Sequence, residues 1–150
     1  METVGDFLQV MIPSYALGMA MNENDWTGAL SFGYSFVSMQ TAVTGLKTAI
    51  DAPRPDNSDN RSFSSGHTAA AFSGATFIHK RYGIKRAAVP YALAGFVGWS
   101  RIDADKHYPH DVLAAAVISG LVTWIFVDKY DGLQLSLSPD SVKLSFGAVF

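Results

Sequence analysis

Two histidines and a nearby aspartate are the residues of this sequence best suited to proton and group transfer. Asp111 follows His107 by four residues, and His67 comes directly after Gly66. Residues four apart share a helix face, so the Asp111 carboxylate can accept Nδ1–H of His107 and leave Nε2 free. A histidine held in this way can act as a nucleophile, and a second histidine can act as general acid and base. The sequence therefore predicts His107 as a nucleophile and His67 as its proton-transfer partner.

Three cationic residues accompany these histidines along the sequence: Lys47, Arg54 and Arg101. Brought together, they would repel one another unless an anion lay among them. Arginine binds phosphate oxygens through two parallel hydrogen bonds, and lysine adds a point charge. Ser65 and Gly66 begin a predicted helix, where free N–H groups and the helix dipole favour an anion. These five residues predict a phosphate-binding site whose cations would also stabilise a phosphoryl group during transfer.

Five apolar stretches, charged only near their ends, predict the helices that position these residues. We expect helices over residues 7–21, 26–47, 64 or 65–79, 87–101 and 108–127. Gly83 is expected to end the third helix, and Pro90 is expected in the first turn of the fourth. Short connections make consecutive helices antiparallel, which brings the three cations and both histidines to one end of the bundle.

The last twenty residues follow a different pattern. Leu133, Leu135 and Leu137 alternate with polar residues, and the alternation resumes after Pro139 and Asp140. A period of two on both sides of a turn predicts a β-hairpin. The expected fold is therefore all-α, an antiparallel bundle of about five helices with a short C-terminal hairpin. We expect one domain over residues 1–150, with a motif core at 46–127 and a tail at 131–150.

Three motifs carry a resemblance to a known family. They are Lys47-x6-Arg54-Pro55, Ser65-Gly66-His67 and Ser100-Arg101-x5-His107-x3-Asp111. Together they resemble the three-part signature of the type-2 phosphatidic acid phosphatase and vanadium haloperoxidase superfamily. The match covers residues 46–111 and extends through the fifth helix, with Ser64 where the family usually has proline.

The resemblance implies an all-helical bundle with a phosphohistidine on His107 and His67 as acid and base. It also implies that Lys47, Arg54 and Arg101 bind phosphate, and no metal or other cofactor is expected. Members of the superfamily are membrane lipid phosphatases, soluble periplasmic acid phosphatases, or haloperoxidases that hold vanadate. The leading expectation is a phosphatase for a lipid phosphate or lipid pyrophosphate. The alternatives are a non-specific acid phosphatase, a vanadate-dependent haloperoxidase, and a protein that binds a phosphorylated lipid without cleaving it.

Composition favours a membrane location for this chain. Hydrophobic residues make up 49% of the sequence and charged residues only 16%, fewer than in an average soluble domain. The turn at residues 80–86 carries four cations and no acid, which predicts that it faces the cytoplasm and that the active site faces the periplasm or cell exterior. A soluble periplasmic protein is the alternative. The net charge of −2 gives no electrostatic reason to expect nucleic acid as a partner.

Overall fold

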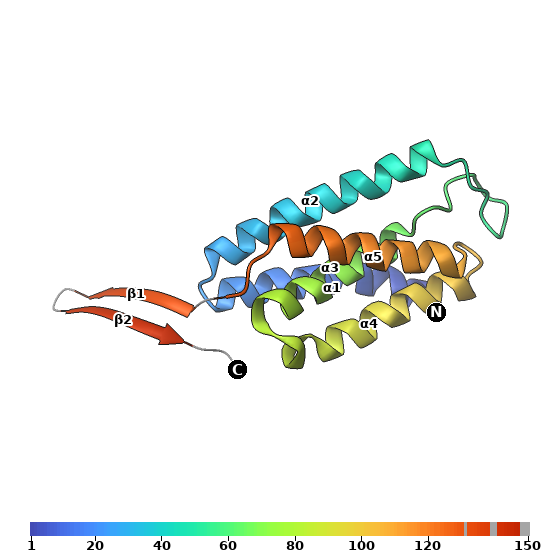
Figure 1. Cartoon of the computed structure of the whole chain (residues 1–150). Helices are drawn as coiled ribbons and strands as arrows, with labels where there is room; N and C mark the ends of the chain where they lie inside the picture. The colour runs from blue at the N-terminus through green and yellow to red at the C-terminus, as the bar shows by residue number, and fades with distance from the viewer. Residues whose placement is uncertain (131, 139–140, 148–150) are drawn as a thin grey trace.

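The computed structural model describes residues 1–130, 132–138 and 141–147, with side chains described up to Tyr130. Its helices form an antiparallel bundle (Figure 1), which confirms the predicted fold class. The helices are α1 (Glu2–Asn22), α2 (Trp26–Ala49), α3 (Gly66–Tyr82), α4 (Ile84–Asp103) and α5 (Pro109–Phe126).

Helix α3 is the centre of the bundle and packs against all four other helices. Most of its buried residues are small, namely alanine, glycine, serine and threonine, which lets neighbouring helices approach closely. Gly74 shows this most clearly, because a Cβ added there would lie 2.9 Å from the carbonyl carbon of Ile12. The absence of a side chain at residue 74 therefore fixes how closely α1 packs on α3.

The end of the bundle far from the site is closed by a buried ion pair. Asp25 caps α2 by accepting a hydrogen bond from Gly28 N at 2.8 Å. The same carboxylate pairs with Arg81 at 2.6 Å and accepts from the Tyr82 hydroxyl at 2.8 Å. The capping role of Asp25 agrees with the predicted start of the second helix.

Two helices begin earlier than the sequence analysis predicted. Helix α1 starts at Glu2 rather than at residue 7, since acidic residues are favourable in the first turn of a helix. Helix α4 starts at Ile84 rather than at residue 87, so Pro90 lies inside the helix and not in its first turn. Gly83, at a φ of 95°, ends α3 as predicted and also caps α4, which leaves no room for a longer turn.

The C-terminal strands agree with the predicted hairpin. Strands β1 (Gly132–Ser138) and β2 (Ser141–Gly147) pair antiparallel, with Gly132 opposite Gly147 and Ser138 opposite Ser141. The expected turn residues, Pro139 and Asp140, lie outside the described part of the chain. Figure 1 shows the strands at the end of the bundle opposite the α2–α3 loop.

Candidate active site

A cavity of about 570 Å³ opens at the end of the bundle where α2 ends and α3 begins. Side chains from α1, α2, α3, α4 and two loops line it, and six of the predicted site residues are among them. Those six are Lys47, Arg54, Gly66, His67, Arg101 and His107. The predicted convergence of the three motifs at one end of the bundle is therefore present in the structure. Ser65 and Asp111 are buried and lie outside the lining of the cavity.

His107 is buried in the loop before α5, and a backbone carbonyl holds its ring. Nδ1 lies 2.7 Å from the carbonyl oxygen of Ser62. A carbonyl oxygen can only accept a hydrogen bond, so Nδ1 must carry the hydrogen and Nε2 keeps its lone pair. Nε2 is therefore the ring atom available for reaction, as the sequence analysis expected.

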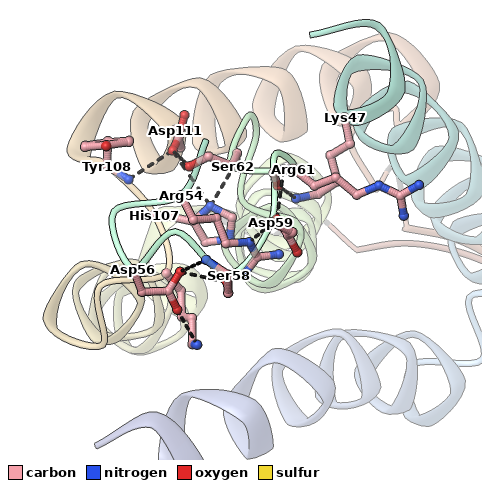
Figure 2. Close-up of polar contacts among 11 residues, drawn as sticks. Lys47, Arg54, Asp56, Ser58, Asp59, Arg61, Ser62, His107, Tyr108 and Asp111 are labelled. Carbon is pink, nitrogen blue, oxygen red and sulfur yellow. Dashed lines mark hydrogen bonds and ion pairs between the residues drawn. The ribbon is translucent and has the colours of Figure 1, made fainter. Parts of the chain in front are cut away.

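Asp111 does not hold the His107 ring directly, which corrects the sequence prediction. Its Oδ2 lies 3.8 Å from Nδ1, too far for a hydrogen bond. That oxygen accepts from the Ser62 hydroxyl and, at 2.9 Å, from Tyr108 N at the start of α5. Figure 2 shows the chain of contacts from Asp111 through Ser62 to His107. The carboxylate thus orients the histidine through Ser62, a residue that sequence spacing gave no reason to select.

The environment of His107 keeps its ring neutral. Burial, followed by the nearby positive charges of Lys47 and Arg54, lowers the pKa of His107 to about 4 from its ordinary value of 6.5. Burial and like charge both disfavour the protonated imidazole. At neutral pH the Nε2 lone pair is therefore present in nearly every molecule.

Acidic residues partly offset the cations of the cavity, which the three sequence motifs do not predict. Arg54 Nε lies 2.7 Å from Asp59 Oδ1, and Arg61 N donates to the same oxygen at 2.8 Å. These contacts hold the pKa of Asp59 below its ordinary value, with the bond from Arg61 N as the largest cause. Five lysines and arginines and three carboxylates line the cavity, so positive charge remains in excess.

The loop between α2 and α3 is held in place by contacts with neighbouring segments. Lys47 Nζ donates to Arg61 O at 3.0 Å, and Lys106 Nζ lies 2.6 Å from Asp56 Oδ2. The bond from Lys106 keeps the pKa of Asp56 below its usual range, so the two form an ion pair at neutral pH. Arg61 and Lys106 both line the cavity. Sequence reasoning missed them because they belong to no spaced motif.

Ser65 and Gly66, which were both predicted to bind phosphate, lie in different surroundings at the start of α3. Ser65 is the cap of the helix, and its hydroxyl accepts from Thr68 N at 3.4 Å and from Thr68 Oγ1 at 2.9 Å. Its own N–H donates to Asp111 O at 3.3 Å, so both groups of Ser65 are engaged away from the cavity. Gly66 lines the cavity, and the N–H groups of Gly66 and His67 lie in the first turn, where no intrahelical acceptor exists.

Helix α1 contributes to the site, although the sequence analysis placed it outside the motifs. Asp6 Oδ1 lies 2.8 Å from Arg101 Nη1 and 3.1 Å from His67 Nε2. Arg101 Nη2 also donates to the carbonyl oxygen of Glu2 at 2.8 Å. The sequence gives only a weak indication of this contact, namely two acids, Glu2 and Asp6, at the start of an otherwise uncharged helix. Asp6 and Arg101 are too far apart along the chain for any local spacing to relate them.

Two of the proteins that are similar to this chain are named as lipid A phosphatases. A lipid A 1-phosphatase of Porphyromonas gingivalis is 36% identical over 115 residues, which are 75% of this chain and 22% of that protein. The chain thus spans less than a quarter of that relative. A lipid A 4′-phosphatase of Helicobacter pylori is 28% identical over 151 residues, covering 93% of this chain and 76% of that protein.

The fold also has a solved counterpart. The crystal structure of Aquifex aeolicus LpxE matches with a TM-score of 0.63 and 23% sequence identity, over 83% of this chain and 86% of that one. Residues 28–133 match the family model of the PAP2 superfamily. This is the phosphatidic acid phosphatase superfamily that the three sequence motifs resemble. On this match the chain belongs to the PAP2 superfamily.

Proposed function

We propose that this chain is a phosphatase that removes phosphate from a phosphorylated lipid through a transient phosphohistidine on His107. The observation that carries the proposal is a neutral His107, with Nε2 free, on the lining of a cavity that also holds Lys47, Arg54 and Arg101. Both relatives are named as phosphatases, which supports the reaction class.

In the first step, phosphate oxygens bind to Lys47, Arg54 and Arg101, and Nε2 of His107 attacks phosphorus. The bond between phosphorus and the alcohol oxygen breaks, and His67 gives its proton to the leaving alkoxide. The Ser62 carbonyl accepts from Nδ1–H and so stabilises the positive charge that develops on the imidazole.

In the second step, neutral His67 removes a proton from water, and the resulting hydroxide attacks phosphorus. The bond between phosphorus and Nε2 then breaks, which releases inorganic phosphate and restores His107. The cations stabilise the transferring phosphoryl group in both steps, and His67 carries out both proton transfers, first to the leaving alkoxide and then from water.

The outer surface of the bundle supports a lipid as the substrate and a membrane as the location. Large hydrophobic side chains are exposed on all four outer helices. Examples are Phe7 and Tyr15 on α1, Leu30 and Tyr34 on α2, Val89 and Leu93 on α4, and Leu113, Leu121 and Ile125 on α5. The charged residues of the helices lie only near their ends. An apolar surface of this extent marks contact with lipid or another protein.

Within the described residues, α5 is the helix that meets length and composition criteria for crossing a membrane. We place the active-site end toward the periplasm or cell exterior, because residues 80–86, where α3 ends and α4 begins, carry four cations and no acid. The chain has no cysteine, so single cysteines at residues 85 and 103 report orientation cleanly. In intact cells, an impermeant maleimide should label residue 103 and leave residue 85 unlabelled; the reverse pattern would refute this orientation.

The function is tested by phosphate release from the purified full chain in detergent. The substrates are bisphosphorylated lipid A, phosphatidate, a lipid pyrophosphate and p-nitrophenyl phosphate. We expect release from at least one lipid, inhibition by vanadate, and no inhibition by EDTA. Release from none of the four, with the protein folded, would refute the proposal. Release from p-nitrophenyl phosphate alone would favour a non-specific phosphatase.

The pH dependence should follow the lowered pKa of His107. Neutral His107 is the reactive form, so on the acid side of the profile kcat/KM should fall as the pH approaches about 4, rather than near 6.5, the ordinary pKa of histidine. Replacing Lys47 with methionine removes one of the cations that disfavour protonation, so the acid limb should move to higher pH. The check is the pH profile of kcat/KM for both proteins, corrected for titration of the substrate phosphate. An unchanged limb in Lys47→Met would contradict this electrostatic explanation.

A further inference from the structure

Helix α1 places a carboxylate between two groups of the proposed active site. Asp6 Oδ1 lies 2.8 Å from Arg101 Nη1 and 3.1 Å from His67 Nε2, so one oxygen joins the arginine to the histidine. The Arg101 side chain is 3% exposed, and its other terminal nitrogen is bound by Glu2 O. None of this helix lies within residues 28–133, the part of the chain that matches the family model.

The close approach of α1 is built into the sequence at Gly5 and Gly74. A Cβ at residue 5 would lie 2.9 Å from Arg101 Nη2 and still closer to the Ser100 hydroxyl. A Cβ at residue 74 would meet the backbone of α1. Because both positions lack a side chain, α1 can pack against α3 and α4 with Asp6 at the cavity.

The contact has a specific chemical consequence for His67. A carboxylate can only accept, so Nε2 of His67 carries the hydrogen that faces Asp6, and Nδ1 is left for proton exchange with substrate or water. Burial, followed by the positive charge of Arg101, lowers the pKa of His67, and Lys47 acts in the same direction. The negative charge of Asp6 opposes them and stabilises the imidazolium that must donate a proton to the leaving group.

We propose that Asp6 is a positioning residue for His67, held in place by Arg101, and that it prepares His67 to protonate the leaving alcohol. This inference rests on the proposed phosphatase function. The site then contains two histidines, each oriented by an aspartate: His107 by Asp111 through Ser62, and His67 by Asp6 directly. Helix α1 is accordingly part of the catalytic unit.

The test compares two substrates that differ in their need for a proton. The alkoxide that leaves phosphatidate must be protonated, whereas p-nitrophenolate leaves without a proton. Asp6→Asn should lower kcat/KM, which reports the steps up to departure of the leaving group, by about 10- to 100-fold for phosphatidate and by no more than a few fold for p-nitrophenyl phosphate. Asp103→Asn removes an exposed carboxylate at the end of α4 and is the matched control, with both rates close to wild type.

A double-mutant cycle with His67→Ala separates positioning from a purely structural role. If Asp6 acts through His67, Asp6→Asn should add little to the loss already caused by His67→Ala. Equal losses on both substrates that add to those of His67→Ala would overturn the proposal, as would unchanged activity. Increased activity would also overturn it, because Asp6 would then be occupying the place of the phosphate.

Two further arms keep the outcome interpretable. If Asp6→Asn does not fold, judged by thermal unfolding, Asp6→Glu keeps the charge and displaces it, and the loss should again be larger for phosphatidate. Equal losses in Asp6→Glu would overturn the proposal. A wild-type protein that cleaves neither substrate refutes the phosphatase function itself, whereas an active wild type with an unaffected Asp6→Asn refutes only the role of Asp6.

Discussion

Replacing His107 with alanine should lower phosphate release by on the order of 10⁴-fold or more, because the variant has lost the atom that attacks phosphorus. His107 lies in a loop, and its buried ring lines the cavity. Because no helix contains this residue, the helices of the variant should still form. The measurement is steady-state phosphate release, with circular dichroism to verify helix content.

His79→Ala is the control for this experiment. His79 lies in the last turn of α3, at the end of that helix opposite the cavity. Its Nδ1 lies 3.2 Å from the hydroxyl oxygen of Tyr91. This variant should retain nearly full turnover. Substantial turnover by folded His107→Ala would show that another group attacks the substrate, and the phosphohistidine mechanism would be wrong.

Replacing Arg54 with alanine should lower kcat/KM by about 10³-fold, since an arginine on a transferring phosphoryl group contributes on this scale. The variant also leaves Asp59 without its cationic partner, which adds uncompensated negative charge to the cavity. Arg54→Lys keeps the charge and loses the paired hydrogen bonds, so its activity should lie between those of Arg54→Ala and the wild type. The measurement is kcat/KM for the best lipid substrate.

Two comparisons isolate the phosphate contact of Arg54. The double variant Arg54→Ala/Asp59→Ala removes the unpaired acid, and it should recover only part of the loss. Arg86→Ala breaks a similar ion pair, with Glu23, at the far end of the bundle and should leave kcat/KM unchanged. Full recovery in the double variant would mean that Arg54 acts only by neutralising Asp59, contrary to a role in binding phosphate.

Much of the site could be predicted from sequence, because alternating helix directions decide which residues share an end of the bundle. Lys47 lies in the last turn of α2 and His67 in the first turn of α3, whereas Arg101 lies near the end of α4 and His107 in the loop that follows it. Their order along the chain, with short connections, was sufficient to bring them together. The family follows from the same three motifs and is confirmed by the match over residues 28–133.

The contacts that sequence could not predict depend on loop paths and on close helix packing. Ser62 stands between Asp111 and His107 only because the loop before α3 folds back over the start of α5. No local period or spacing encodes that path. The uncharged stretch predicts a first helix that begins after Asp6. The contact of Asp6 with Arg101 depends on α1 packing tightly against the bundle, which no spacing in the sequence indicates.

The most direct test of the central claim is to trap phosphate on His107. With p-nitrophenyl phosphate, His67→Ala should form the phosphohistidine at a substantial rate, because p-nitrophenolate needs no proton. Hydrolysis of that intermediate still needs a base, so the phosphorylated protein should accumulate. Quenching at alkaline pH and peptide mass spectrometry should then find phosphate on His107, and none in His107→Ala. Turnover by the wild type with no phosphate on His107 in folded His67→Ala, or with phosphate on another residue, would contradict the mechanism.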